Sequence, residues 1–419
     1  MDILYILGAG ASASIDQSVP VMANFFEKAI EMLDESNNLF CVAFAVAEEA
    51  RAFPSNPNIE NSGIRIGELG RLLERIKRGK LPISQPLLGD LEKRLKDYIH
   101  VYKENFKSDK NRMSANLEDV LLRLESYNDI NPAAANAYAN AYDRFQFVIG
   151  SLFGRLDKDL SGKFSKAAHH DLITFIANGG RVKHTFISFN YDLWLEKALA
   201  KKELWHPEQG HGSYRFQYYS PPVEDAGPNE GAVVVKDIKD SYKPRKFQNN
   251  NKSKVTVLKP HGSLAWRLGR DTNNVVVILE NGEHSCVSYN KTWYFPPSLF
   301  QEGTERTLIP LVVPPTENKI RNHPIFWQTD QDIVEALIEA DVVVIIGWSM
   351  PETDHYIRDI LVRGLNGRNE QLKKMVICHK GDRSNKLQSK FEAIFRPTES
   401  RVYDEGFSKK FVDFLKDEL

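Results

Sequence analysis

Residues 3–14 read ILYILGAGASAS, a short apolar run that ends in a Gly-Ala-Gly turn. The segment 21–33 follows, with apolar residues at the spacing typical of an amphipathic helix. A strand, a tight turn and a helix in this order open an α/β nucleotide-binding unit. The N-terminus therefore predicts a Rossmann-type core built on a mainly parallel sheet.

The turn itself is the first candidate binding site. Gly8 and Gly10 would let the backbone approach a pyrophosphate, and the N–H groups at a helix start favour an anion. The pattern departs from G-x-G-x-x-G, because Ala13 stands at the third glycine position. A tight turn that binds no ligand explains the same residues, so this motif alone does not decide between the two readings.

Farther along the chain, strands and helices alternate again. Expected strands cover 184–189, 341–347 and 374–379, and expected helices cover 192–201, 331–339, 352–365, 385–395 and the chain from 407 onward. Strands that alternate with helices indicate a mainly parallel sheet covered on both faces.

Two regions interrupt this alternation. Residues 39–166 have helical periodicity in the segments 64–77, 87–101, 117–124 and 133–156, which predicts a large helical insertion. Residues 203–310 are richer in Pro, Gly and Asn and contain short β-type runs at 233–235, 255–258 and 275–279. We therefore expect a core formed by 1–38 and 167–419, with an irregular β-rich module at 203–310 inside it.

Composition excludes several classes of protein. The chain has 419 residues, 42% of them hydrophobic, which is enough to bury a sizeable core. Lys and Arg number 55 against 56 Asp and Glu, so the basic excess typical of nucleic-acid binding is missing. The N-terminus lacks the pattern of a signal peptide, and the strongly apolar run at 342–348 is too short to span a bilayer. These features predict a cytoplasmic protein.

The cysteines predict the absence of a zinc module. Cys41, Cys286 and Cys378 lie far apart, and no C-x-x-C pair exists, so neither a zinc ribbon nor a disulfide framework is encoded. We expect no metal to be required.

The segment 188–192, Ser-Phe-Asn-Tyr-Asp, falls where a parallel strand ends and a helix begins. Ligands of open α/β sheets bind beyond the carboxyl ends of the strands. Asn190 can donate and accept hydrogen bonds at once, which suits a ribose hydroxyl or a water, and Asp192 can face a developing cation. Either residue could instead cap the following helix.

Two more segments complete the set of candidate motifs. In Lys-Pro-His-Gly-Ser at 259–263, His261 lies in a rigid turn, and a neutral imidazole is the natural general base near neutral pH. In Gly-Trp-Ser-Met-Pro-Glu-Thr-Asp at 347–354, a glycine and a hydroxyl at a strand end make a second place for a phosphate or ribose. An ordinary surface turn and a helix cap remain the alternatives.

The four motifs GAGAS, FNYD, KPHGS and IIGWSMPETD, in this order, resemble those of the sirtuin-like superfamily. The resemblance spans nearly the whole chain and implies a Rossmann-like NAD-binding core. It gives catalytic roles to Asn190 and His261 and a supporting role to Asp192. It also implies that the dinucleotide is lined by Gly8, Gly10, Ala11, Ser12, Gly347 and Ser349.

The chain departs from the protein-deacylating sirtuins at two points. The four paired zinc cysteines are absent, and Pro20-Val21-Met22-Ala23 replaces the Pro-Asp-Phe-Arg stretch that follows the glycine turn in those enzymes. What remains resembles the zinc-free, sirtuin-like effectors of bacterial antiphage defence, which hydrolyse NAD. The resemblance implies a homo-oligomer, and some members act beside a HerA-like ATPase.

The sequence analysis therefore predicts an NAD glycohydrolase that breaks the nicotinamide–ribose bond. Three alternatives stay open: a sensor that binds NAD or ADP-ribose without cleaving it, an ADP-ribosyltransferase, and a Rossmann-like assembly scaffold.

Overall fold

The structure is a computed structural model of the whole chain. Besides scattered positions between 69 and 157, it describes residues 1–31, 81–108, 159–180, 182–205, 211–213, 217–219, 254–269, 275–280, 283–284, 308–312, 324–351, 354–381 and 384–419.

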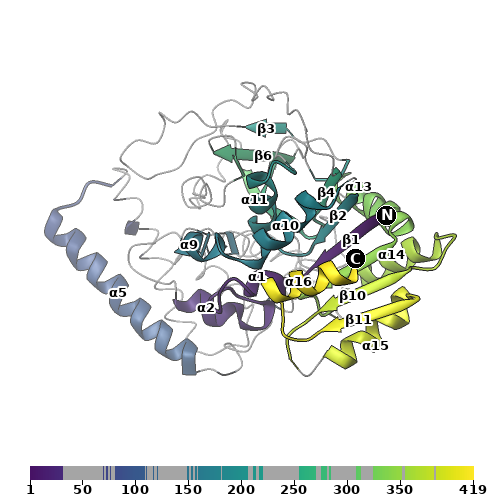
Figure 1. Cartoon of the computed structure of the whole chain (residues 1–419). Coiled ribbons are helices and arrows are strands. Elements are labelled where there is room, and N and C mark those ends of the chain that lie inside the picture. The colour runs from purple at the N-terminus through teal and green to yellow at the C-terminus, as the bar shows by residue number, and fades with distance from the viewer. Residues whose placement is uncertain are drawn as a thin grey trace.

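A six-stranded parallel sheet forms the centre of the molecule (Figure 1). In space its order is β11-β10-β9-β1-β2-β4, and each of the five neighbouring pairs is parallel. With the six strands counted along the chain, this is the order 6-5-4-1-2-3, the arrangement of Rossmann-type folds. The strands are β1 (Asp2–Leu7), β2 (Lys183–Ser188), β4 (Lys254–Leu258), β9 (Val342–Ile346), β10 (Lys374–Cys378) and β11 (Glu399–Tyr403).

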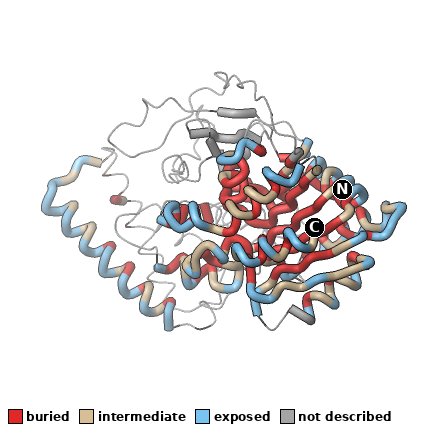
Figure 2. The backbone as a smooth tube through the Cα atoms, viewed as in Figure 1, coloured by how far each residue is buried: buried red, intermediate tan, exposed pale blue. Residues whose placement is uncertain are grey.

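Alternate residues of the central strand β1 enter two separate hydrophobic cores, as expected when both faces of a sheet are covered. Ile3, Tyr5 and Leu7 belong to one cluster, whereas Leu4 and Ile6 belong to the other. In Figure 2 buried residues dominate the inner strands of this sheet. The first cluster includes α2 (Phe25–Glu31), α10 (Ala168–Asn178), α11 (Trp194–Lys201) and α16 (Lys409–Glu418), and the second includes α13 (Pro324–Glu339), α14 (His355–Asn366) and α15 (Ser384–Phe395).

A second, smaller sheet has the order β3-β6-β5-β8. Its strands are β3 (Gln217–Tyr219), β5 (Gly262–Gly269), β6 (Val275–Glu280) and β8 (Leu308–Val312), and β7 (Glu283–His284) pairs with β6. The β-rich module thus has a sheet of its own. The prediction was wrong for one strand: β4, which we placed in the module, pairs with β2 and belongs to the core sheet.

In the helical region, α5 (Gln85–Ser108) contains the helix expected at 87–101 and extends beyond both of its ends. It is seen in Figure 1 as a long helix at the margin of the molecule. Its buried residues Leu95, Ile99, Tyr102 and Phe106 recur at helical spacing. Near its C-terminus, Lys107 lies 2.8 Å from Glu31 of α2. Most of 64–77, 117–124 and 133–156 lies outside the described residues.

Several boundaries differ from those expected. α1 (Ala9–Ala13) begins directly after Gly8, so the turn is shorter than predicted, and a 3₁₀ turn at Met22–Asn24 precedes α2. α13 starts at Pro324, seven residues before the expected helix. α10, the short helix α9 (Ser161–Phe164) and β11 were not predicted. Among the described residues, no helix is both long and apolar enough to cross a membrane.

Candidate active site

The four sequence motifs meet at the carboxyl ends of the core strands. The Gly8 N–H donates to the Ile346 carbonyl at the end of β9 (3.0 Å), and the Phe189 N–H donates to the Leu7 carbonyl at the end of β1 (2.9 Å). The Leu264 N–H, just beyond the histidine motif, donates to the Tyr191 carbonyl (2.9 Å). Backbone hydrogen bonds therefore join each motif to at least one other.

The three motif glycines pack backbone against backbone. A Cβ on Gly8 would lie 2.6 Å from the Cα of Trp348, and one on Gly10 would lie 2.9 Å from the Cα of Gly347. Gly347 has φ +62°, and a Cβ there would lie 2.4 Å from the Ala11 nitrogen. The Gly10 N–H donates to the Gly347 carbonyl (2.9 Å). These glycines thus hold β1 and β9 together, and the Gly10 N–H is already engaged in the protein.

The side chain of Asn190 is oriented by the glycine turn. Its Nδ2 donates to the Gly8 carbonyl (2.9 Å) and to the Ser12 hydroxyl (2.8 Å). Because a backbone carbonyl can only accept, the contact with Gly8 decides which end of the amide faces the turn. No described residue donates to Oδ1, which is left as an acceptor. These contacts do not make Asn190 a helix cap; they join its amide to the glycine turn.

Ser12 joins Asn190 to Asp192. Its hydroxyl accepts from Asn190 and donates to Asp192 Oδ2 (2.6 Å), and the other carboxylate oxygen, Oδ1, accepts from the Trp194 N–H (3.2 Å). Asp192 thus contacts the first N–H of α11, in part as the cap reading expected. Through Oδ2 it also accepts from the Ser12 hydroxyl, the same hydroxyl that accepts from Asn190.

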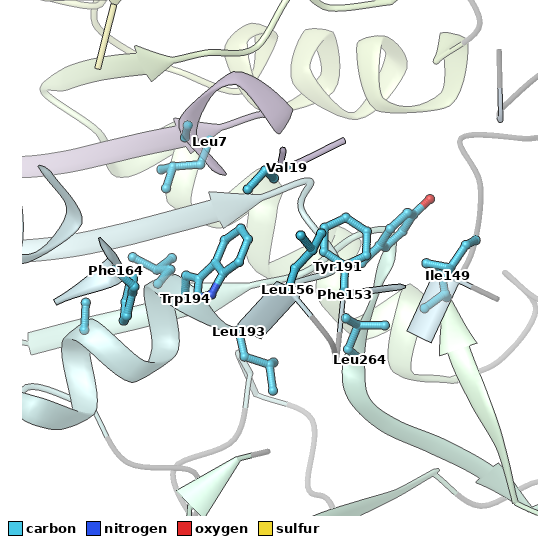
Figure 3. Packing of buried hydrophobic residues seen from close by; sticks show 14 of the residues in the cluster. Leu7, Val19, Ile149, Phe153, Leu156, Phe164, Tyr191, Leu193, Trp194 and Leu264 are labelled. Carbon is cyan, nitrogen blue, oxygen red and sulfur yellow. The ribbon is translucent and has the colours of Figure 1, made fainter. Parts of the chain in front are cut away.

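Neighbouring apolar residues fix this loop in the core. Tyr191, Leu193 and Trp194 are each at most 2% exposed. Figure 3 shows them packed in one cluster with Phe153 and Phe164. Because these apolar residues flank Asp192 and follow Asn190, their burial leaves the two polar side chains facing the glycine turn.

A buried charged network lies beneath the loop. The Lys259 ammonium, fully buried, donates to the Asp192 carbonyl and to Glu196 Oε1 (2.7 Å). His211 Nε2 lies 3.3 Å from the same Glu196 oxygen, and Trp266 Nε1 donates to His211 Nδ1 (3.3 Å). Lys259 thereby connects the histidine motif with both the Asn190 loop and α11.

Burial and the Lys259 charge together set the protonation of this network. Burial alone would raise the pKa of Glu196, but the Lys259 ammonium and His211 outweigh it and lower the pKa to about 2. Burial raises the pKa of Asp192, against the opposing effects of Lys259 and the Ser12 hydrogen bond. Burial lowers the pKa of His211. We therefore treat Lys259 and Glu196 as a charged pair beside a neutral His211.

His261 lies in the short connection between β4 of the core sheet and β5 of the second sheet. The next residue, Gly262, has φ +82°, and a Cβ there would lie 2.1 Å from the Leu311 carbonyl oxygen, so the turn requires glycine. His261 is buried, and its ring centroid is 5.1 Å from that of Phe189. Its Nε2 lies 3.2 Å from Oδ2 of Asp354, the residue that precedes α14.

The fourth motif, 347–354, packs against the segment that contains Phe189 and Asn190. Trp348 stacks on Phe189 with ring centroids 4.7 Å apart, so the two motifs share an aromatic contact. Ser349 is exposed, and its carbonyl accepts from Lys390 of α15 (3.4 Å). Lys390 also binds the carbonyl of Met350, which has φ +50°.

The nine predicted site residues therefore lie in loops or helix starts that follow the core strands, and the fold brings these segments together, but the residues differ in accessibility. Ala11 and Ser12 are buried, whereas Gly10 and Ser349 are exposed. Whether any of them contacts NAD stays a prediction. Sequence reasoning missed Lys259, Glu196 and Asp354. Two of these stand inside motifs that we had quoted, whereas nothing in the local pattern marks Glu196 as buried.

No protein-family model matches this chain, and the comparison with curated proteins found no match.

Proposed function

We propose that this protein is an NAD glycohydrolase that cleaves the nicotinamide–ribose bond to give nicotinamide and ADP-ribose. The observation that carries the proposal is the convergence of Asn190 and His261, 71 positions apart in sequence, at one edge of a Rossmann-type sheet. Ligands of such sheets bind beyond the carboxyl ends of the strands, near the point where the strand order reverses. Here that point lies between β1 and β9, beside Gly8 and Gly347.

In this proposal Asn190 orients the reacting groups. Its Nδ2 is held by Gly8 and Ser12, so the amide plane is fixed before substrate arrives. The Oδ1 acceptor then holds a ribose hydroxyl or the attacking water. Such preorganisation lowers the barrier because the protein need not reorganise during the reaction.

His261 acts as the general base. Water attacks C1′ of the nicotinamide ribose, the bond to the nicotinamide nitrogen breaks, and its electron pair leaves with neutral nicotinamide. The proton lost by the water, directly or through a ribose hydroxyl, passes to His261. General-base assistance of this kind contributes about 10²–10⁴-fold.

The buried side chains around these residues would supply a water-poor environment. Phe189 lies against the imidazole, Trp348 stacks on Phe189, and both aromatic residues are less than 10% exposed. Few waters near a developing oxocarbenium ion would strengthen its attraction to the amide oxygen and to other fixed dipoles. The pyrophosphate is expected at the loops of Gly8–Ser12 and Gly347–Ser349, although the Gly10 N–H is engaged with Gly347.

The test is to incubate the purified protein with NAD and identify the products. Free nicotinamide and ADP-ribose in equal amounts support hydrolysis. ADP-ribose attached to protein or nucleic acid would make the chain a transferase, and binding without turnover would make it a sensor. Neither result would be compatible with the proposal. Activity that survives EDTA would support the metal-free mechanism, and activity restored only by zinc would contradict it.

The defence role is part of the proposal that rests on the resemblance alone. A phage-defence effector can be silent until it is triggered, so the assay is repeated with lysate from phage-infected cells and with a co-expressed HerA-like ATPase. Light scattering tests the proposed homo-oligomer, in which residues 39–166 are the expected contact region.

A further inference from the structure

We infer that Asp354 is a positioning residue for His261, and that it holds the imidazole with its proton on Nε2. The inference deepens the proposed function and rests on it for its catalytic meaning. Its physical basis is the buried carboxylate of Asp354, for which the described residues provide no aligned hydrogen bond.

Asp354 is fully buried, and neither carboxylate oxygen has a hydrogen-bond partner within the part of the chain that the structure describes. An unpaired buried carboxylate is costly, because it loses its hydration without compensation. Proteins keep such groups mainly where they serve a function, since most buried polar atoms are satisfied.

The nearest polar atom to that carboxylate is on His261. Oδ2 lies 3.2 Å from Nε2, and Nε2 is itself buried and has no aligned hydrogen bond. The distance allows an N–H···O bond, but the angle does not meet hydrogen-bond geometry. A small rotation of the imidazole, 7% exposed at its side chain, would align the pair. Catalytic hydrogen bonds are often long or poorly aligned before substrate binds.

The consequence concerns which nitrogen acts as the base. A neutral imidazole carries one proton, and the partner of one nitrogen decides the tautomer. If Asp354 accepts the proton of Nε2–H, the lone pair is on Nδ1, which then receives the proton in the reaction. Asp354 need not touch the substrate to have this effect.

The backbone fixes Asp354 in this place. Its N–H donates to the Pro351 carbonyl (3.2 Å), and its carbonyl accepts from Arg358 in the first turn of α14 (3.3 Å). β9 leads into the same loop, so the core sheet positions both partners: β4 precedes His261 and β9 precedes Asp354.

The decisive variant is Asp354→Asn, which keeps the shape and removes the charge. We expect kcat to fall on the order of 10- to 100-fold with little change in KM. The melting temperature should stay the same or rise, because a buried charge is removed and no hydrogen bond aligned in this structure is lost. A structural role predicts the opposite: a lower melting temperature and activity that follows the folded fraction. A raised KM at unchanged kcat would make Asp354 a ligand contact and overturn the inference.

The matched control is Asp330→Asn. Asp330 is also a buried carboxylate beside α14, where Tyr356 donates to it, but it does not contact His261. This variant should retain kcat. If Asp330→Asn lowered kcat as much as Asp354→Asn, the effect would not be specific to Asp354, and the inference would be overturned.

A second measurement does not depend on turnover. Nitrogen-15 NMR of histidine-labelled protein at about pH 8 reports the tautomer directly. The His261 signals are assigned by their loss in His261→Gln. The wild-type protein should show Nε2–H, and Asp354→Asn should show a mixture. A proton on Nδ1 in the wild type, or identical spectra in both proteins, would overturn the inference. If the wild type does not cleave NAD, the proposed function fails, while this spectrum still decides the His261–Asp354 pair.

Discussion

Asn190 and His261 follow neighbouring strands of one sheet, but the protein holds their side chains in opposite ways. Asn190 is fixed by Gly8 and Ser12, and beneath it Lys259 binds the Asp192 carbonyl. His261 has an aromatic contact with Phe189 and a carboxylate 3.2 Å away, but no aligned hydrogen bond at Nε2 among the described residues. The difference indicates one side chain that is held by hydrogen bonds and one that is not. Under the proposed function, the first would orient the reacting groups and the second would accept the proton.

The largest expected effect comes from the buried Lys259 charge, which binds the Asp192 carbonyl in the Asn190 loop. Lys259→Met removes one partner of a fully buried ion pair and leaves Glu196 uncompensated, which costs about 3–5 kcal/mol of unfolding free energy. Denaturant unfolding measures it. The control Lys163→Met breaks an exposed pair with Asp16 and should cost less than about 1 kcal/mol. Equal losses in the two variants would mean that the network does not stabilise the Asn190 loop.

The next expected effect separates stability from turnover. Asn190→Ala should lower NAD cleavage about 100-fold, equivalent to about 2.7 kcal/mol, and should also destabilise the fold because the buried Gly8 carbonyl loses a donor. His261→Gln should lower cleavage by a similar factor, at a cost in stability of about 1 kcal/mol or less, since it breaks no aligned hydrogen bond.

Turnover and denaturant unfolding are measured on both variants, with His355→Gln as the control. His355 is exposed and directly follows Asp354, so its loss should change neither quantity. Wild-type turnover in either site variant would exclude that residue from the mechanism. Equal stability losses would remove the contrast between the two side chains.

Much of this fold follows from local sequence patterns. Apolar β-type runs gave β1, β2, β9 and β10 within a residue or two, because buried parallel strands are nearly continuous hydrophobic segments. β11 was missed, since Glu399–Tyr403 begins with three polar residues and none of its residues is buried. β4 was assigned to the wrong sheet. Its partner β2 is far away in sequence, so only the register between 183–187 and 254–258 reveals the pairing.

The candidate site was predictable only in outline. The motifs mark which strand ends carry chemistry, but Glu196 lies on an amphipathic helix between Leu195 and Lys197, where an exposed carboxylate is the normal expectation. Its burial follows from Lys259, 63 positions later, and such a pairing has no local signal. Asp354 likewise is recognisable only once α14 and β4 are placed together.

Acid should weaken the Lys259–Glu196 pair within a defined pH range. The pKa of Glu196 is lowered from 4.5 to about 2 in the folded protein, so its stabilising contribution is complete above about pH 4.5 and is lost as the pH falls toward 2. The stability difference between wild type and Glu196→Gln should therefore be constant above about pH 5. Below that it should shrink by about 1.4 kcal/mol per pH unit.

Denaturant unfolding across this range, for the wild type and Glu196→Gln, gives the difference directly. Glu339→Gln serves as the control because Glu339 pairs with Lys183 at the surface, and its effect should stay below about 1 kcal/mol throughout. A difference that shrinks already between about pH 7 and 5 would contradict the charged Lys259–Glu196 pair.

The smallest expected effect concerns two serines that were given the same role by sequence. Ser12 is buried and bonded to Asp192 and Asn190, whereas the side chain of Ser349 is exposed beyond β9. If Ser349 contacts the dinucleotide, Ser349→Ala should raise the KM for NAD about fivefold, the value of one hydrogen bond of about 1 kcal/mol, and should leave kcat and stability unchanged. Steady-state kinetics and a melting curve measure these quantities. Ser389→Ala, an exposed serine on α15, should change none of them. An unchanged KM in Ser349→Ala would exclude the Ser349 hydroxyl from binding, and would leave this loop with the backbone contact between Gly347 and Gly10 as its shown role.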